Sequence, residues 1–358
     1  ASYRADHWRS ARAVLSFYMD TQRIDTIVET HNLPTYRRQQ LLHAFFTENC
    51  ATIDEVTTLS KSLRASINLP TMTVRKRRVL VSNEGNAFKA LVELDDGKLI
   101  ETVLLKPKPG LWSCCISSQV GCLMKCSFCA TGLLGFTRHL TSEEITDQVL
   151  FWRQYIQAER LDANLRNVVY MGMGEPFHNK DAVFASLREL TNPETFNIGA
   201  RNISVSTSGL VPAIEEFTDQ FPQINLAVSL HAATDELRQH LMPVNKPYPL
   251  EKLRAAIDYY VDNTNRKVFI EYIMLDGEND QPAHAEKLVH YIRGMARPHL
   301  AHVNLIVYNP TDAAHRESPR TIARAFLAIL KDNGLSATIR KNLGRDIDGA
   351  CGQLALKG

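Results

Sequence analysis

The sequence predicts an α/β fold built on a parallel sheet, and three observations support this. Short β-rich runs alternate with helical segments over the last two thirds of the chain. Repeated strand-then-helix units connect by right-handed crossovers, which give a parallel sheet that is either open or rolled into a barrel. The 358 residues, 44% of them hydrophobic, suffice for one large core and a smaller second domain.

The first 111 residues have a different texture. Residues 1–70 predict helices, because apolar residues recur at spacings of three and four in Asp25–His31, Thr35–Asn49 and Ile53–Asn68. The next stretch predicts a β-meander with strands at Arg78–Ser82, Ala87–Leu94 and Leu99–Leu105, followed by a linker at Lys106–Gly110. We therefore expect an N-terminal helical accessory domain at 1–70, a small β-extension and linker at 71–111, and a core at 112–358.

The core is expected to alternate between strands and helices. A first strand should lead into a cysteine cluster. Later strands are predicted at Val168–Met173, Asn202–Thr207, Asn225–His231, Lys267–Leu275, His302–Asn309 and Leu335–Lys341. Helices are predicted at Ser142–Ala158, Lys180–Leu190, Val211–Thr218, Pro249–Asn263, Gln281–Met295 and Ser318–Asn333. In a barrel, functional residues belong at the carboxyl ends of the strands.

The charge and hydropathy of the sequence limit which partners we expect. The net charge is +2, but residues 1–80 carry twelve Lys/Arg against seven Asp/Glu. A basic N-terminal part suits contact with a polyanion, although ordinary scatter of surface charge explains the counts equally well. No apolar run reaches the length of a membrane span and no signal-peptide core is present, so we expect a cytoplasmic protein without membrane contact.

Seven cysteines are present, and five lie within residues 114–129. Cys122, Cys126 and Cys129 have the spacing C-x3-C-x2-C, which lets three thiolates bind three irons of a [4Fe–4S] cluster and leaves the fourth iron open. The alternatives are a zinc site, for which a close fourth ligand is missing, a four-cysteine electron carrier, and three inert buried thiols.

This spacing, with an aromatic residue before the last cysteine, resembles the signature of radical S-adenosylmethionine (SAM) enzymes. Five further motifs resemble the RlmN/Cfr family of radical SAM RNA adenosine methyltransferases. They are Cys115–Cys122, Met171–Pro176, Ser206–Gly209, Ser229–His231 and Asp346–Leu354. The resemblance covers nearly the whole chain, including Leu33–Arg37. It implies a partial (β/α)6 TIM-like radical SAM barrel and a cluster whose fourth iron is chelated by SAM.

The resemblance also implies where SAM binds. Gly174 and Glu175 would hold its methionine end, since glycines at a strand end let the backbone approach a ligand and a carboxylate accepts from an ammonium group. Further SAM contacts are implied at Ser206, Ser229, Leu230, His231 and Asn309. All of these lie at predicted strand ends, although a turn or capping role is the ordinary alternative for each polar residue.

A covalent mechanism follows from the same resemblance. Cys351 matches a cysteine that one SAM methylates; a second SAM then yields a 5′-deoxyadenosyl radical, which removes hydrogen from that methyl group. The methylene radical adds to the base, and Cys115 matches the resolving thiol that closes a disulfide and releases the RNA. Glu101 matches a proton acceptor, with one residue of offset. Cys114 departs from the family pattern and is expected to face the core.

The implied substrates are C2 of an adenosine in 23S rRNA, in the peptidyl-transferase region, and an adenosine in the tRNA anticodon loop. The alternatives are C8 methylation of the same ribosomal adenosine, of the type that confers antibiotic resistance, and a non-catalytic Fe–S module that binds RNA. Tyr36–Arg38 and Arg75–Arg78 are candidates for RNA contact. We further expect an electron donor such as flavodoxin or ferredoxin, and a monomer.

Overall fold

The computed structural model describes residues 21–67, 72–162, 164–311 and 313–356. Within these ranges ten strands form one sheet, in the order β1-β2-β3-β4-β7-β8-β9-β10-β11-β12. The strands from β4 onward run parallel, whereas β1, β2 and β3 pair antiparallel. None of the helices in the described ranges has the length and apolar character needed to cross a membrane.

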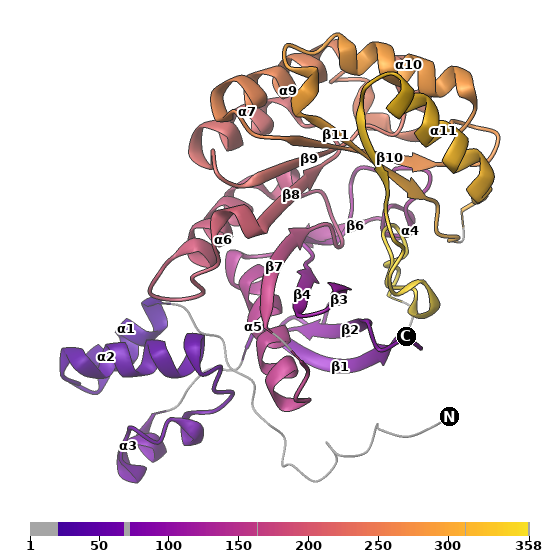
Figure 1. Cartoon of the computed structure of the whole chain (residues 1–358). Coiled ribbons are helices and arrows are strands. Elements are labelled where there is room, and N and C mark those ends of the chain that lie inside the picture. The colour runs from indigo at the N-terminus through magenta and orange to yellow at the C-terminus, as the bar shows by residue number, and fades with distance from the viewer. Residues whose placement is uncertain (1–20, 68–71, 163, 312, 357–358) are drawn as a thin grey trace.

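The parallel strands form the curved wall of a partial barrel, and helices lie along its outer face (Figure 1). The strands are β4 (Leu111–Cys115), β7 (Leu165–Tyr170), β8 (Ile203–Thr207), β9 (Asn225–Ser229), β10 (Val268–Met274), β11 (Ala301–Val307) and β12 (Ser336–Ile339). The helices between them are α5 (Ser142–Ala158), α6 (Lys180–Thr191), α7 (Val211–Gln220), α8 (Asp235–Leu241), α9 (Leu250–Thr264), α10 (Pro282–Arg293) and α11 (Arg320–Asp332). Six strands are each followed by a helix, so the expected (β/α)6 architecture is confirmed.

The β-extension joins the edge of this same sheet. Its strands are β1 (Val74–Val81), β2 (Ala87–Leu94) and β3 (Leu99–Lys108). The stretch Lys106–Gly110, expected to be a linker, instead completes β3 and turns directly into β4. The prediction was wrong because Pro107 is tolerated near the end of a strand, and Gly110 supplies the positive φ of +75° that the tight turn needs.

The N-terminal helices differ in their bounds from those that the pattern predicts. They comprise α1 (Thr21–Thr30), α2 (Thr35–Leu42) with a π-helical turn at His43–Thr47, a 3-10 turn at Ile53–Glu55, and α3 (Lys61–Ser66). The single helix expected at Ile53–Asn68 is therefore wrong. It is interrupted because Ser60 caps a new helix, its Oγ accepting from the Leu63 N–H at 3.3 Å. Residues 1–20 and 68–70 of this expectation lie outside the described ranges.

The cysteine segment lies between β4 and α5. It contains a small antiparallel hairpin of β5 (Gln119–Gly121) and β6 (Phe136–His139), with the short helix α4 (Ala130–Leu133) between them. The Thr141–Glu144 capping box then starts α5. This arrangement places the loop of residues 122–129 over the carboxyl ends of the parallel strands.

Candidate functional site

One cavity, with a volume of about 160 Å³, gathers most of the residues that the motifs singled out. It opens at the carboxyl ends of β7, β8, β9 and β10, as the barrel expectation requires. The singled-out residues that line it are Cys122, Cys126, Cys129, Gly174, Glu175, Ser206, Ser229, His231 and Cys351. Residues from five separate segments of the sequence thus meet in one place.

The loop that carries the three spaced cysteines is anchored on both sides. The Ser127 N–H donates to the Leu241 carbonyl at 3.0 Å, and its hydroxyl lies 2.9 Å from His315 Nε2. Cys129 is the residue immediately before α4. Burial raises the pKa of Cys122 to about 12, with Glu175 and Cys129 adding to the effect. The thiolate form of a cysteine at this position is therefore unfavourable unless a positively charged group binds it.

The three thiols fit a cube better than a single ion. Among the described residues, no three His, Cys, Asp or Glu side chains are grouped so that they could hold one metal ion. In a [4Fe–4S] cluster each thiolate binds a different iron, so the three sulfurs need not converge on one point. The one further cysteine in the described lining of the cavity, Cys351, comes from the C-terminal segment and lies outside the C-x3-C-x2-C spacing. The donor set thus suits a three-cysteine cluster.

Glu175 provides an acceptor for a cationic ligand. Its Oε1 accepts from the Phe177 N–H at 3.0 Å and its Oε2 from the Ser208 N–H at 2.7 Å, and the residue is almost fully buried. Burial raises the pKa of Glu175, while these N–H groups act against the rise. Beside it, Gly174 has a φ of +98°, and a Cβ there would lie 2.5 Å from Gln119 Cβ. Only glycine fits at this approach.

Asn309 and His231 offer further polar contacts. Asn309 donates from Nδ2 to the Cys351 carbonyl at 3.2 Å, while its buried Oδ1 has no partner among the described residues. Such an orphaned acceptor fits a donor on a bound ligand such as SAM. His231 Nδ1 accepts from the Ile273 N–H at 3.0 Å, so Nε2 carries the proton. Burial and the Arg238 charge lower the pKa of His231 to about 3, and the ring stays neutral.

Two residues expected to contact SAM, Leu230 and Asn309, are absent from the cavity lining. Leu230 is fully buried outside the cavity lining, and its carbonyl accepts from Arg238 Nε at 3.2 Å. Arg238, also fully buried, donates from Nη2 to the Ser208 carbonyl at 2.6 Å. This arginine therefore braces the two strand ends that carry Ser206 and Ser229.

Cys351 stands on a turn that leans on the cluster loop. The Gly352 carbonyl accepts from the Ala130 N–H at 2.9 Å, and the Leu354 carbonyl accepts from Thr131 Oγ1 at 2.7 Å. The Cys351 residue is exposed, and its thiol is free. The C-terminal segment and the cluster loop are thus bound to each other through residues directly after Cys129.

Cys115 lies on β4, buried and free, close enough to Cys351 for the two sulfurs to influence each other. Burial raises the pKa of Cys115, and the Cys351 charge raises it further. The Met171 N–H, at the end of the neighbouring strand β7, approaches the Cys115 sulfur and acts in the opposite direction. Cys114 is fully buried in the main hydrophobic core, consistent with alternation along a strand.

Glu101 is placed differently from the other candidates. It lies on β3, outside the cavity lining, and its side chain is 0% exposed. Oε1 lies 2.8 Å from Lys89 Nζ, and Oε2 accepts from the N–H groups of Ala355 and Leu356 at 2.9 and 3.2 Å. The carboxylate therefore holds the C-terminal segment four residues beyond Cys351.

Two charged residues of the cavity were missed from the sequence. Glu271 lies within β10, and Arg340 directly follows β12; Arg340 Nη1 is 3.2 Å from Glu271 Oε2. The available signal was a single charged residue inside an otherwise apolar predicted strand, in Lys267–Leu275, and an arginine at the end of Leu335–Lys341. A buried charge at the carboxyl end of a barrel strand marks a site more often than a core.

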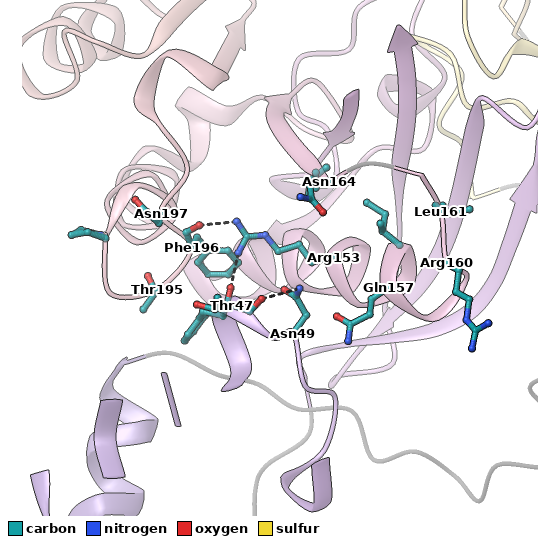
Figure 2. Close-up of a pocket in the computed structure, with 14 residues that line it drawn as sticks. Thr47, Asn49, Arg153, Gln157, Arg160, Leu161, Asn164, Thr195, Phe196 and Asn197 are labelled. Atoms are coloured by element: carbon teal, nitrogen blue, oxygen red, sulfur yellow. Dashed lines mark hydrogen bonds between the residues drawn. The ribbon is translucent and has the colours of Figure 1, made fainter. Parts of the chain in front are cut away.

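A second, larger cavity of about 690 Å³ lies where the π-helical turn at His43–Thr47 meets α5 and the loop after α6 (Figure 2). Arg153 points between these segments, donating to the carbonyls of Phe46 at 3.1 Å and Phe196 at 2.7 Å. The lining of this second cavity includes none of the cysteines or SAM-motif residues. Arg153 thus joins the N-terminal helices to the barrel, away from the candidate site.

The candidate RNA contacts lie on the surface. On β1, at the edge of the sheet, Arg75 pairs with Asp95 at 2.5 Å and Arg77 pairs with Glu93. On α2, Arg38 pairs with Asp25 and Glu194, whereas Tyr36 is exposed. Acidic neighbours thus offset part of the basic charge of both segments.

Comparison with known proteins agrees with this geometry. Residues 116–289 match the family model described as "Radical SAM superfamily". The chain is 43% identical over 331 residues to the "Probable dual-specificity RNA methyltransferase RlmN" of Enterococcus faecalis, covering 91% of this chain and 92% of that protein. The protein of the same name from Streptococcus mutans is 42% identical, with 90% of each chain covered.

A solved structure is also similar over nearly its whole length. The crystal structure of a radical SAM methyltransferase from Sphaerobacter thermophilus superposes with a TM-score of 0.88 at 40% identity, covering 95% of this chain and 98% of that one. Identity of this level over nine tenths or more of each chain, together with the cavity of three spaced cysteines, establishes the family. The chain belongs to the radical SAM superfamily and, within it, to the RlmN family of methyltransferases.

Proposed function

We infer that this protein methylates C2 of an adenosine in 23S rRNA, in the peptidyl-transferase region, and an adenosine in the tRNA anticodon loop. The observation that carries the inference is the meeting of Cys351 with the three spaced cysteines in one cavity, with Cys115 beside it. Family relatives bear the name of dual-specificity RNA methyltransferases, which supports RNA as the substrate. Carbon atoms of adenine are poor nucleophiles, so a covalent carrier such as Cys351 suits the chemistry.

The residues of the site have separate roles in the proposed reaction. Cys122, Cys126 and Cys129 hold three irons of the cluster, and Glu175, Ser206, Ser229, His231 and Asn309 hold SAM. When bound, one SAM would supply a methyl group, and a second SAM would supply a radical that removes hydrogen from it. The Cys351 thiolate accepts the methyl group by forming an S–CH₃ bond, and its proton leaves first. An external electron donor such as flavodoxin or ferredoxin would supply the electron that cleaves the second SAM. The radical adduct formed with the base would give back one electron when it loses its proton.

Release of the product is the task of Cys115. Its thiolate attacks the Cys351 sulfur, an S–S bond forms, and the S–C bond to the modified base breaks. The electron pair stays on the carbon, which takes up a proton to become the methyl group. Glu101 accepts the proton that the base loses. Because its carboxylate is covered by the N–H groups of Ala355 and Leu356, this step requires the C-terminal segment to move away.

The direct test is mass spectrometry of nucleosides from 23S rRNA and tRNA after treatment with reconstituted enzyme, SAM and reductant. The proposal expects 2-methyladenosine in both RNAs. Formation of 8-methyladenosine would assign the chain to the alternative C8 chemistry. The absence of both methylated nucleosides and of 5′-deoxyadenosine would favour a non-catalytic Fe–S module.

The resolving role has its own test. Cys115→Ala removes the thiol that closes the disulfide, so the adduct between Cys351 and RNA cannot break down. Purified C115A protein should carry covalently bound RNA that survives denaturation. The matched control is Cys114→Ala, which removes the neighbouring thiol on the core side and should leave no crosslinked RNA. Normal turnover by C115A would refute the role.

A further inference from the structure

The loop between the second and third spaced cysteines is bound by a side chain from a distant part of the sequence. His315 lies between β11 and α11, and its side chain is 10% exposed. Its Nδ1 lies 2.6 Å from Glu278 Oε1, and its Nε2 lies 2.9 Å from Ser127 Oγ. Because a carboxylate only accepts, Nδ1 carries a proton and donates it. Nε2 then bonds the hydroxyl as an acceptor in the neutral ring or as a donor in the charged one. We call these three side chains the Glu278–His315–Ser127 relay.

The two loops that supply the carboxylate and the imidazole of this relay are bonded to each other. The Asp276 N–H donates to the Arg316 carbonyl at 3.0 Å. Asp280 Oδ2 accepts from Ser318 Oγ at 2.7 Å, and both of these side chains are almost fully buried. Hydrogen bonds therefore join the residues on either side of the carboxylate to those that follow the imidazole. The imidazole thus approaches Ser127 from a fixed base.

The residue after Ser127 belongs to the wall of the candidate site. Phe128 is 7% exposed and packs in a small apolar cluster that includes Leu275 and Tyr308. Its ring meets the ring of His231 edge-on, with 4.8 Å between the centroids, and both residues line the cavity. A displacement of Ser127 would therefore also shift a side chain of the expected SAM pocket.

A carboxylate, an imidazole and a hydroxyl in a row also occur in serine hydrolases, but the surroundings of Ser127 do not suit a nucleophile. In such enzymes the N–H of the nucleophile or of a residue near it binds the developing oxyanion. Here the Ser127 N–H donates to the Leu241 carbonyl at 3.0 Å, and the Cys129 N–H donates to the Cys126 carbonyl at 3.2 Å. The arrangement therefore favours a positional role.

We propose that His315 is a positioning residue for the iron–sulfur site: anchored by Glu278, it fixes Ser127 and with it the loop that carries Cys126 and Cys129. The proposal rests on the proposed function in one respect, which is that these two cysteines bind irons of the cluster. Each thiolate has to meet its own iron, so a loop that shifts weakens two iron–sulfur bonds at once. His315 acts through Ser127 and undergoes no chemical change.

The test measures how firmly the cluster is held and requires no RNA. Anaerobic holoenzyme is reduced and mixed with a chelator of ferrous iron, and the rate of iron release is followed by absorbance. His315→Leu should release iron about fivefold faster, the effect of one lost hydrogen bond. Ser127→Ala should behave alike. The double variant should release iron no faster than either single variant, because both changes remove the same bond.

Two further variants separate this role from general damage. His315→Gln places an amide N–H near the position of Nε2 and should recover most of the wild-type rate. The matched control is His302→Leu at the amino end of β11. It removes an imidazole whose nitrogens also bond two hydroxyls, those of Ser336 at 2.7 Å and Thr338 at 3.0 Å, and should leave the rate unchanged.

A spectroscopic signature accompanies the rates. The EPR line shape of the reduced cluster should change in His315→Leu and in Ser127→Ala alike, and should return towards the wild-type shape in His315→Gln. If His315→Leu takes up no cluster, Glu278→Ala decides instead: the imidazole remains but loses its anchor, and iron release should be faster than in the wild type, by less than fivefold.

Three results would overturn the proposal. One is wild-type iron release in both His315→Leu and Ser127→Ala, or in Glu278→Ala when the former is unusable. Another is a double variant in which the two effects add, since the residues would then act independently. The third is covalent labelling of Ser127 by a fluorophosphonate, which would make this serine a nucleophile.

The outcome is distinguishable from failure of the proposed function. If the wild-type enzyme forms methyladenosine but the variants release iron at the wild-type rate, the role of His315 alone is wrong. If the variants release iron faster but the wild-type enzyme makes no methyladenosine, the positioning role stands and the proposed function is wrong.

Discussion

Two buried carboxylates in this molecule differ in what balances their charge. Glu101 has its charge matched by Lys89, and both side chains are at most 2% exposed. Glu175 borders the cavity and receives backbone N–H groups, and its pKa is raised by burial. The charge of Glu101 is thus neutralised by a cation of the chain itself, whereas Glu175 is placed to pair with a cationic ligand. A buried charge without a matching charge indicates a ligand site.

The largest expected effect comes from breaking the completed pair. Lys89→Met leaves Glu101 as an uncompensated buried charge and should lower the free energy of unfolding by about 3–5 kcal/mol. Denaturant titration of the holoenzyme measures this, and faster amide exchange at Ala355 and Leu356 should accompany it. Lys180→Met, which breaks the exposed pair with Glu216, is the control and should have a much smaller effect on stability.

A double variant sharpens this prediction. Adding Glu101→Gln to Lys89→Met removes the orphaned charge and should recover much of the lost stability. If the double variant is no more stable than Lys89→Met, the loss comes from altered packing around β2 and β3, and the ion pair is not its source.

The next effect separates the two carboxylates by function. Glu175→Gln keeps the shape but removes the charge, and should weaken SAM binding to the holoenzyme about 10- to 100-fold, the range for a charge-assisted hydrogen bond. Equilibrium dialysis with labelled SAM provides the measurement. Glu101→Gln should leave SAM affinity unchanged, because Glu101 lies outside the cavity lining. Equal losses in both variants would erase the distinction.

A smaller effect follows from the raised pKa of Glu175. The ammonium group of SAM binds the carboxylate form, so affinity is greatest above this pKa and falls as pH drops through it. The limit is about tenfold for each pH unit. Dialysis between pH 5 and 8 should show this decline in the wild type and a flatter profile in Glu175→Gln. A profile of the same slope in both proteins would mean that another group titrates.

Part of the fold could be read from local signals. The α5 helix has the predicted bounds because Thr141 and Glu144 form a capping box before a periodic apolar face. The β2 strand also has its predicted bounds, set by the turns on either side. The α8 helix was missed although Thr234 caps it and two acidic residues follow, since seven residues are too few to show a helical period.

The residues of the site also divide into those that local motifs predicted and those that they did not. The cysteine spacing and the glycines of Met171–Pro176 are local, so they predicted residues that do line the cavity. The pairing of Lys89 with Glu101 depends on the order of the strands in the sheet, and so does the pairing of Arg340 with Glu271. Strand order is set by the packing of the whole chain, and no short motif encodes it. The division into three domains stays a prediction, as do the electron donor and the monomeric state.

The most direct measurement is metal analysis and EPR spectroscopy of anaerobically prepared protein, reduced, with and without SAM. We expect about four iron atoms per chain and a [4Fe–4S] signal that SAM changes in the wild type, with a weaker change in Glu175→Gln. Bound zinc in place of iron, or a cluster signal indifferent to SAM, would contradict the account of the cavity and of the chemistry assigned to it.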